Sequence, residues 1–121
     1  MGVDMDAYHL VRVWQLKEGC TGAELEELMA SGYLEMQRWI PGVKHIALVR
    51  VGGDGRGRYV LTTTFASYEA YSYWRQVEEE AADYWERYAA IIMQWERTCY
   101  LLEEYAGELV VDVDLGDGVP S

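Results

Sequence analysis

The residues from Phe65 to Tyr105 limit most strongly what this chain can fold into. This stretch contains no Gly and no Pro, and it holds eleven of the sixteen aromatic residues of the chain. Within it, apolar residues alternate steps of three and four, which is the spacing of one face of an α-helix. We expect a helix of about five turns whose apolar face packs against a sheet, a partner chain or a ligand. This face comprises Trp85, Tyr88, Ile92, Trp95, Cys99 and Leu102.

Length and composition restrict the class of protein. With 121 residues, half of them hydrophobic, we expect one domain over 1–121, with loose termini at 1–7 and 115–121. The net charge of −11 argues against nucleic acid and against an anionic membrane as partners. The sequence has no apolar run of spanning length and no N-terminal signal, and Cys20 and Cys99 have no Cys-x-x-Cys partner. We therefore expect a cytoplasmic protein with free thiols, no metal and no cofactor. The acidic run Glu78-Glu79-Glu80 is interpreted as a solvated helix face.

The order of patterns along the chain predicts an α+β fold. Thr21 and Glu24 have the spacing of a capping box, and Pro41-Gly42 ends the helix that follows. The glycine-rich segment 52–57 lies between two strand patterns, which indicates a hairpin and not a phosphate-binding loop. Ser67 is expected to cap the second helical segment, with a bend near 78–82. The predicted strands are 8–16, 43–51, 58–65 and 108–114, and the predicted helices are 22–39 and 67–105.

The order β-α-β-β-α(α)-β fits the ferredoxin-like pattern, a four-stranded antiparallel sheet with helices on one face. On the first strand, alternation separates Leu10, Trp14 and Leu16 from His9, Val11 and Val13. We expect the set with Leu10 on the uncovered face and the set with His9 under the helices. An uncovered apolar face predicts a homodimer formed through this face. Arg12 and Asp112 are expected to form an ion pair there. The remaining apolar residues expected on the uncovered face are Ile46, Leu48, Val60 and Val110.

At this point the chain resembles a known superfamily over roughly residues 8–114. Three segments carry the resemblance: Tyr8-His9-Leu10-Val11, Ile40-Pro41-Gly42-Val43, and Phe65-Ala66-Ser67-Tyr68-Glu69-Ala70 followed by Trp74. It is similar to the dimeric α+β barrel proteins, which include antibiotic biosynthesis monooxygenases, stress-responsive A/B barrel proteins and small polyketide cyclases. The resemblance implies a homodimer with a hydrophobic pocket between the sheet and the helices of each subunit.

The resemblance and the alternation together suggest candidate site residues. Histidine can accept a proton near neutral pH, and cyclases of this superfamily have a histidine where His9 stands. No histidine follows on the later helix, and the chain has no Asn, so the known cyclase and haem-degrading residue sets are not reproduced. We expect His9 as general base, with Tyr71 or Tyr88 donating a hydrogen bond to the developing oxyanion. The residues expected to contact a ligand are Val11, Val13, Tyr33, Tyr59, Phe65, Trp74 and Trp85.

Three functional hypotheses remain open from the sequence. The first is a cofactor-independent monooxygenase or cyclase that acts on a small aromatic or polyketide-like compound. The second is a non-catalytic protein that binds a small apolar metabolite. The third is a structural dimer in which the aromatic residues fill the core and leave no open pocket.

Overall fold

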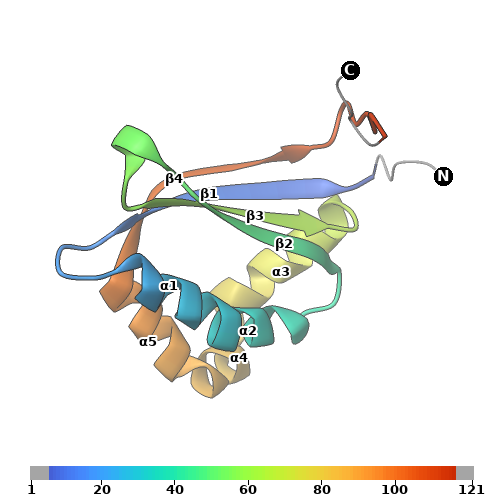
Figure 1. The fold of residues 1–121 in the computed structure, drawn as a ribbon. Helices are drawn as coiled ribbons and strands as arrows, with labels where there is room; N and C mark the ends of the chain where they lie inside the picture. The colour runs from blue at the N-terminus through green and yellow to red at the C-terminus, as the bar shows by residue number, and fades with distance from the viewer. Residues whose placement is uncertain (1–5, 117–121) are drawn as a thin grey trace.

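The computed structural model describes residues 6–116, which form one four-stranded sheet with all helices on one face (Figure 1). The sheet is antiparallel with the strand order β2-β3-β1-β4, which confirms the predicted ferredoxin-like α+β fold. Most of the predicted loose termini lie outside the described residues. The strands are β1 (Tyr8–Leu16), β2 (Val43–Arg50), β3 (Arg58–Phe65) and β4 (Cys99–Glu108).

The first helical segment begins as the sequence predicts. The Thr21 side chain accepts a hydrogen bond from the Glu24 amide, and the Glu24 carboxylate accepts one from the Thr21 amide. This reciprocal pair satisfies two amides that no helical carbonyl can reach. The segment consists of α1 (Gly22–Leu28), a π-helical turn (Met29–Tyr33) and α2 (Leu34–Arg38).

The second helical segment contains the predicted bend and one further break. The Ser67 side chain caps α3 (Tyr68–Glu80), and Ala81 then takes an extended conformation, which confirms the bend near 78–82. Tyr88, with φ −112° and ψ 19°, separates α4 (Ala82–Arg87) from α5 (Ala89–Thr98). This second break was not predicted, because nothing in the local sequence marks it.

The prediction of the fourth strand was wrong. Cys99–Glu108 is β4, although residues 99–105 were expected to continue the long helix. Of the strand expected at 108–114, only Glu108 belongs to β4, and residues 109–114 have no regular structure. β4 pairs with β1 from Leu16 opposite Cys99 to Tyr8 opposite Glu108. Because β1 offers a free edge of nine residues, pairing outweighs the helical pattern, which by itself is a weak determinant. Leu102 has no partner on β1, since the register shifts between Val13 and Trp14.

The assignment of the faces of β1 was also wrong. Leu10 lies opposite Thr63 and Arg12 lies opposite Leu61, so both share the face of β3 that is buried under the helices. Ile46 and Leu48 of β2 lie on that face too. The side of the sheet away from the helices, named the outer face here, remains rich in small apolar residues. It comprises His9, Val11, Val13, His45, Ala47, Val49, Val60, Thr62, Thr64, Glu103, Tyr105 and Gly107.

The core lies between the sheet and the helices in two clusters. Trp74 and Phe65, both 0 % exposed, centre the first cluster together with Leu10. Leu25 and Leu61 belong to the second cluster, together with aromatic side chains from β3, α5 and the π-helical turn. Each fully buried large side chain removes enough apolar surface from water to stabilise the fold by about 1.5–3 kcal/mol.

Candidate functional site: a cavity between the sheet and the helices

A cavity of about 350 Å³ lies between β1 and β4 on one side and the helices on the other. This volume is within the range of small-molecule sites. Its walls are mainly apolar and aromatic, and they come from β1, the first helical segment, α4 and α5. The main apolar lining residues are Trp14, Tyr33, Met36, Trp85, Ile92 and Trp95.

Four charged residues line this mainly apolar cavity, Arg12, Lys17, Glu78 and Glu96, and two of them form an ion pair. Arg12 projects from β1 and Glu78 from α3, and the Arg12 Nη2 atom lies 3.7 Å from the Glu78 Oε1 atom. Their side chains are only 13 % and 19 % exposed. Burying charged groups is unfavourable unless other groups compensate them, so this pair needs a specific environment.

The Arg12 guanidinium is held by contacts on several sides. Its Nε atom donates to the Glu104 carboxylate at 2.6 Å, and its Cζ atom lies 5.1 Å from the centre of a Trp74 ring. Glu104 is in turn held by Arg75, whose Nη2 atom also donates to the Tyr71 hydroxyl at 2.7 Å. The expected pair of Arg12 with Asp112 is not formed, because the position of β4 brings Glu104 to this place. Arg12 is therefore fixed in position beside the cavity.

Glu78 is a buried acid with a raised pKa. Removal of its carboxylate from water is the main cause, and it outweighs the opposing effects of Arg12, Arg75 and Gln37. A raised pKa brings a carboxylate closer to the range in which it exchanges protons near neutral pH. The interpretation of residues 78–80 as a solvated face was wrong for Glu78, while Glu79 and Glu80 are exposed. Perturbed acids in apolar cavities are typical of functional sites.

Two buried polar atoms of the lining residues have no hydrogen-bond partner among the described residues. They are the Trp14 Nε1 atom and the Tyr33 hydroxyl, whose neighbour Thr63 does not reach it with hydrogen-bond geometry. Burial raises the pKa of Tyr33, so its hydroxyl stays protonated and can donate. Buried donors are normally paired, and each unpaired donor is unfavourable by about 1–3 kcal/mol.

The structure brings together some of the residues predicted for the site and separates others. Tyr33 and Trp85 line the cavity, whereas Trp74 and Phe65 are fully buried beside it. Tyr59 lines a different cavity, described below. Tyr88 is buried in the core, with its hydroxyl unpaired, and Tyr71 is half-buried near Arg75.

The remaining predicted residues lie on the outer face, so the expectation that they face the helices was wrong. The His9 Nδ1 atom is 3.2 Å from the Thr64 Oγ1 atom, and its Nε2 atom is buried without a partner among the described residues. Val11 and Val13 are on the same face as His9. The cause of the error is that both alternating sets on β1 are largely apolar. Arg12 and Trp14 were missed for this reason, although a charge between two apolar residues of a strand was a usable signal. Glu78 was missed because it belongs to an acidic run on α3 that was interpreted as solvated.

Two classes of site and segment are absent from the part of the chain that the structure describes. Residues 6–116 contain no group of three His, Cys, Asp or Glu side chains placed to hold a metal ion. No helix within these residues is both long enough and apolar enough to cross a membrane.

Comparisons with known proteins agree with this architecture. No family model matches the chain, and no curated protein matches its sequence. SnoaB, a cofactor-independent oxygenase from Streptomyces nogalater, aligns over 93% of this chain and 99% of its own, with 16% identity and a TM-score of 0.60. HapK from Hahella chejuensis aligns over 90% of this chain and 98% of its own, with 14% identity and a TM-score of 0.66.

A dimeric ferredoxin-like protein from an uncultured marine organism aligns over 93% of this chain and 96% of its own, with 12% identity and a TM-score of 0.65. Such likenesses define a class of ferredoxin-like α+β proteins. Like these proteins, the chain has a ferredoxin-like α+β fold, in agreement with the fold that the sequence resemblance implied. Because one fold carries many activities, the fold alone does not define the reaction.

Proposed function

We propose that this protein is an enzyme that removes a proton from a small hydroxylated aromatic compound bound in the cavity between the sheet and the helices. The observation that carries the proposal is the largely buried Glu78 carboxylate, which has a raised pKa and lines a mainly apolar cavity. A base of this kind is most effective when its pKa approaches the working pH.

Each lining group has a role in this reaction. The Glu78 carboxylate accepts the proton, and the Arg12 guanidinium stabilises the negative charge that develops on the substrate oxygen. The Trp14 Nε1 atom and the Tyr33 hydroxyl donate hydrogen bonds to substrate oxygens, which orients the ring. Trp85 and Trp95 pack against the aromatic faces of the substrate and exclude water.

The similarity to SnoaB supports an oxygen-dependent reaction as the second step. Removal of a proton from an activated ring carbon gives a carbanion, and addition of O₂ to this carbanion gives a peroxide anion. Glu78, protonated in the first step, returns its proton to the peroxide, so that the enzyme is regenerated. These two steps require no electron from a protein-bound group, in line with SnoaB, which is a cofactor-independent oxygenase. In a cyclase, the same removal of a proton would be followed by closure of a ring instead of addition of O₂.

The catalytic roles of His9, Tyr71 and Tyr88 stay predictions. The proposal assigns proton removal to Glu78, because His9 is on the opposite side of the sheet from the cavity. In this proposal Tyr71 acts indirectly. Its hydroxyl accepts a hydrogen bond from Arg75, and Arg75 in turn holds Glu104.

We propose further that the functional unit is a homodimer paired through the outer face. Val49 is 55% exposed on this face, and Val11, Val13 and Val60 lie beside it in the sheet. Paired sheets would remove this surface from water. The marine protein with the same fold, described as dimeric, supports this assignment.

A binding protein without turnover is the second candidate. The observation that favours it is the pairing of Arg12, whose Nε atom already donates to Glu104 at 2.6 Å. An arginine that is already paired with a carboxylate stabilises the negative charge of a transition state less strongly. In this case a ligand would occupy the cavity through the same donors without being changed.

Turnover measurements separate the two candidates. We would follow O₂ consumption with a panel of hydroxylated naphthalenes and anthrones, and ligand binding through the fluorescence of the cavity tryptophans. Glu78→Gln should lower kcat by about 100-fold or more with KM nearly unchanged, because general bases contribute about 10²–10⁴-fold. Glu80→Gln, an exposed neighbour on α3, is the matched control and should leave kcat unchanged. Binding without O₂ consumption would favour the second candidate, and full activity of Glu78→Gln would refute the assignment of the base.

A further inference from the structure

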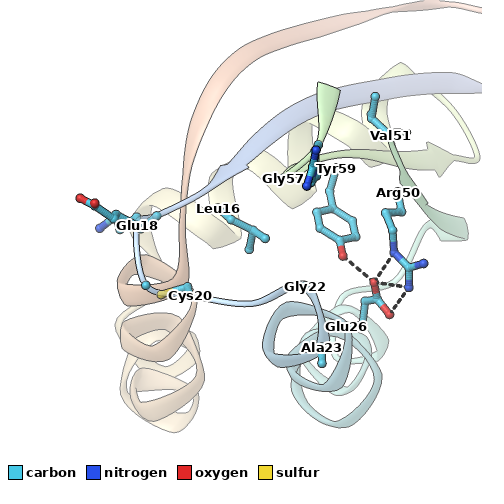
Figure 2. A pocket seen from close by; sticks show the side chains of 13 residues that line it. Leu16, Glu18, Cys20, Gly22, Ala23, Glu26, Arg50, Val51, Gly57 and Tyr59 are labelled. Atoms are coloured by element: carbon cyan, nitrogen blue, oxygen red, sulfur yellow. Dashed lines mark hydrogen bonds and ion pairs between the residues drawn. The ribbon is translucent and has the colours of Figure 1, made fainter. Parts of the chain in front are cut away.

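A second cavity, of about 600 Å³, opens beside the end of β1 (Figure 2). It lies between the first residues of α1 and the ends of β2 and β3, where the two layers separate. Leu16, Val51 and the ring of Tyr59 form its apolar part. Among residues 6–116, Lys17 alone lines both this cavity and the one between β4 and the helices. The two cavities are therefore distinct sites.

One wall of this second cavity is held by a network of three side chains. Glu26 of α1 accepts hydrogen bonds from the Arg50 Nε atom at 2.8 Å and the Arg50 Nη2 atom at 2.7 Å. The Tyr59 hydroxyl donates to the same carboxylate at 2.5 Å, as Figure 2 shows. These donors, Tyr59 first and then Arg50, lower the pKa of Glu26. The wall is thus formed before any ligand arrives.

Gly22 permits this network. A Cβ atom at Gly22 would lie 2.3 Å from the Tyr59 hydroxyl, so any other residue would displace the tyrosine. The absence of a side chain here keeps both the hydrogen bond and the space next to it.

The charge around this cavity is opposite to that of the chain as a whole. Three of the ten basic residues line it, Lys17, Arg50 and Arg56, whereas the chain carries a net charge of −11. Of the two acidic lining residues, Glu26 is neutralised by Arg50. Figure 2 shows that the Glu18 side chain points away from Tyr59 and Arg50. Lys17, anchored on the Glu96 carbonyl oxygen, and Arg56 leave a local excess of positive charge.

We infer that this second cavity is a binding site for a small amphipathic anion, an aromatic or short aliphatic molecule with one carboxylate or sulfonate group. The apolar body lies on Leu16, Val51 and the Tyr59 ring. The anionic group lies toward Arg56 and Lys17, at the mouth of the cavity. Small-molecule sites combine an apolar lining with a few placed polar groups in the same way. An arginine at the mouth suits a carboxylate or sulfonate because its fork of donors can bind two oxygens at once.

Cys20 provides a direct measurement, because it lines this cavity and is partly exposed. Cys99 is 2 % exposed, and burial raises the pKa of its thiol to about 12, so it reacts slowly. We would measure the reaction rate of Cys20 with the neutral reagent 4,4′-dithiodipyridine as 1-naphthalenesulfonate is added. The Cys20→Ser variant gives the background rate of Cys99, and naphthalene-1-sulfonamide is the uncharged probe of the same shape.

We expect the sulfonate to slow the modification of Cys20 at least about fivefold, and the sulfonamide less than about twofold. Arg56→Glu should weaken protection by the sulfonate by about three- to tenfold. The substitution changes the local charge by about two elementary charges at a site that solvent partly screens. Arg38→Glu is the matched control, because its side chain is 78% exposed outside this cavity, and it should change protection less than about twofold.

Three outcomes would overturn the inference. They are no protection at about 10 mM sulfonate, which excludes even a weak site, equal protection by the sulfonamide, and equal losses in Arg56→Glu and Arg38→Glu. The last would show that only the overall charge of the protein acts on the probe. None of these results depends on turnover in the cavity that contains Glu78, so the inference and the proposed function can fail separately.

Discussion

Glu78→Gln should change activity and stability in opposite directions. The Glu78 carboxyl has a raised pKa in the folded protein because burial disfavours its charged form. A carboxyl with a raised pKa contributes stability that is fully present below its ordinary pKa of 4.5. This stability is lost as the pH rises through the pKa of the carboxyl in the folded protein. Above its folded pKa the ionised Glu78 therefore destabilises the fold, and a neutral glutamine of similar shape removes that effect.

The magnitude follows from linkage between protonation and folding. Each unit by which the folded pKa exceeds the ordinary value lowers the free energy of unfolding by about 1.4 kcal/mol at high pH. Urea denaturation of the wild type and of Glu78→Gln at about pH 4 and pH 8 gives the difference in stability at each pH. The stability of the variant relative to the wild type should be greater at about pH 8 than at about pH 4. An NMR titration of Glu78 gives an independent value of the same pKa, so the two experiments must agree.

The comparison uses the change with pH and not the stability difference at one pH. This choice matters because glutamine also alters the contact with Arg12, whose Nη2 atom lies 3.7 Å from Glu78. The contact between the glutamine and Arg12 is the same at both pH values, because arginine is charged at both. The attraction between Arg12 and the ionised Glu78 is one of the causes of the pKa of Glu78, so it is already contained in the measured change. A change smaller than about 0.5 kcal/mol between the two pH values would refute the reasoning, because a shift of well under one unit cannot prepare a base. Glu80→Gln should show no such change.

Three further predictions concern the core, the outer face and the second cavity. Gln37→Leu removes the acceptor of the Trp74 Nε1 atom at 2.6 Å, so urea denaturation should show a loss of about 1–3 kcal/mol; an unchanged midpoint would contradict it. Val49→Lys places a charge on the outer face and should convert a dimer to a folded monomer in light scattering. A dimer that persists would count against pairing through this face. Gly22→Ala should displace Tyr59 from Glu26, and the pKa of Glu26 should rise toward its ordinary value in an NMR titration.

Local signals were sufficient for much of the fold. Thr21 with Glu24 and Ser67 marked two helix starts, because capping needs only residues that are near in sequence. The glycines at 52–57 marked the hairpin between β2 and β3, and the ranges of β1, β2 and β3 were predicted to within one residue. These features depend on contacts between neighbours in the chain, so the sequence displays them directly.

Features that depend on distant partners could not be read in the same way. Residues Cys99–Glu108 contain no Gly or Pro before Gly107, and only their pairing with β1 makes them a strand. The face of β1 depends on which of two apolar sets contacts the helices, and an error of one residue exchanges the faces. Glu78 lies beside Arg12, which is 66 positions away in the numbering. Because this contact is distant in sequence, the residues next to Glu78 did not indicate that its side chain is largely buried.

The unpaired Leu102 in β4 has a consequence for how this strand can change length. On its two sides, Leu101 lies opposite Trp14 and Glu103 lies opposite Val13, so removal of Leu102 would leave a regular ladder with every other side chain on its present face. Loss of Glu103 would have the same effect, because Leu102 would then lie opposite Val13 and Glu104 would stay opposite Arg12. Loss of Tyr105 would instead exchange the two faces over part of the strand and turn Glu104 away from Arg12. Residues 102–103 are therefore the place at which β4 can lose one residue while the charge cluster and the cavity wall both keep their places. Comparisons of related chains should find single-residue gaps here before they find them elsewhere in the strand.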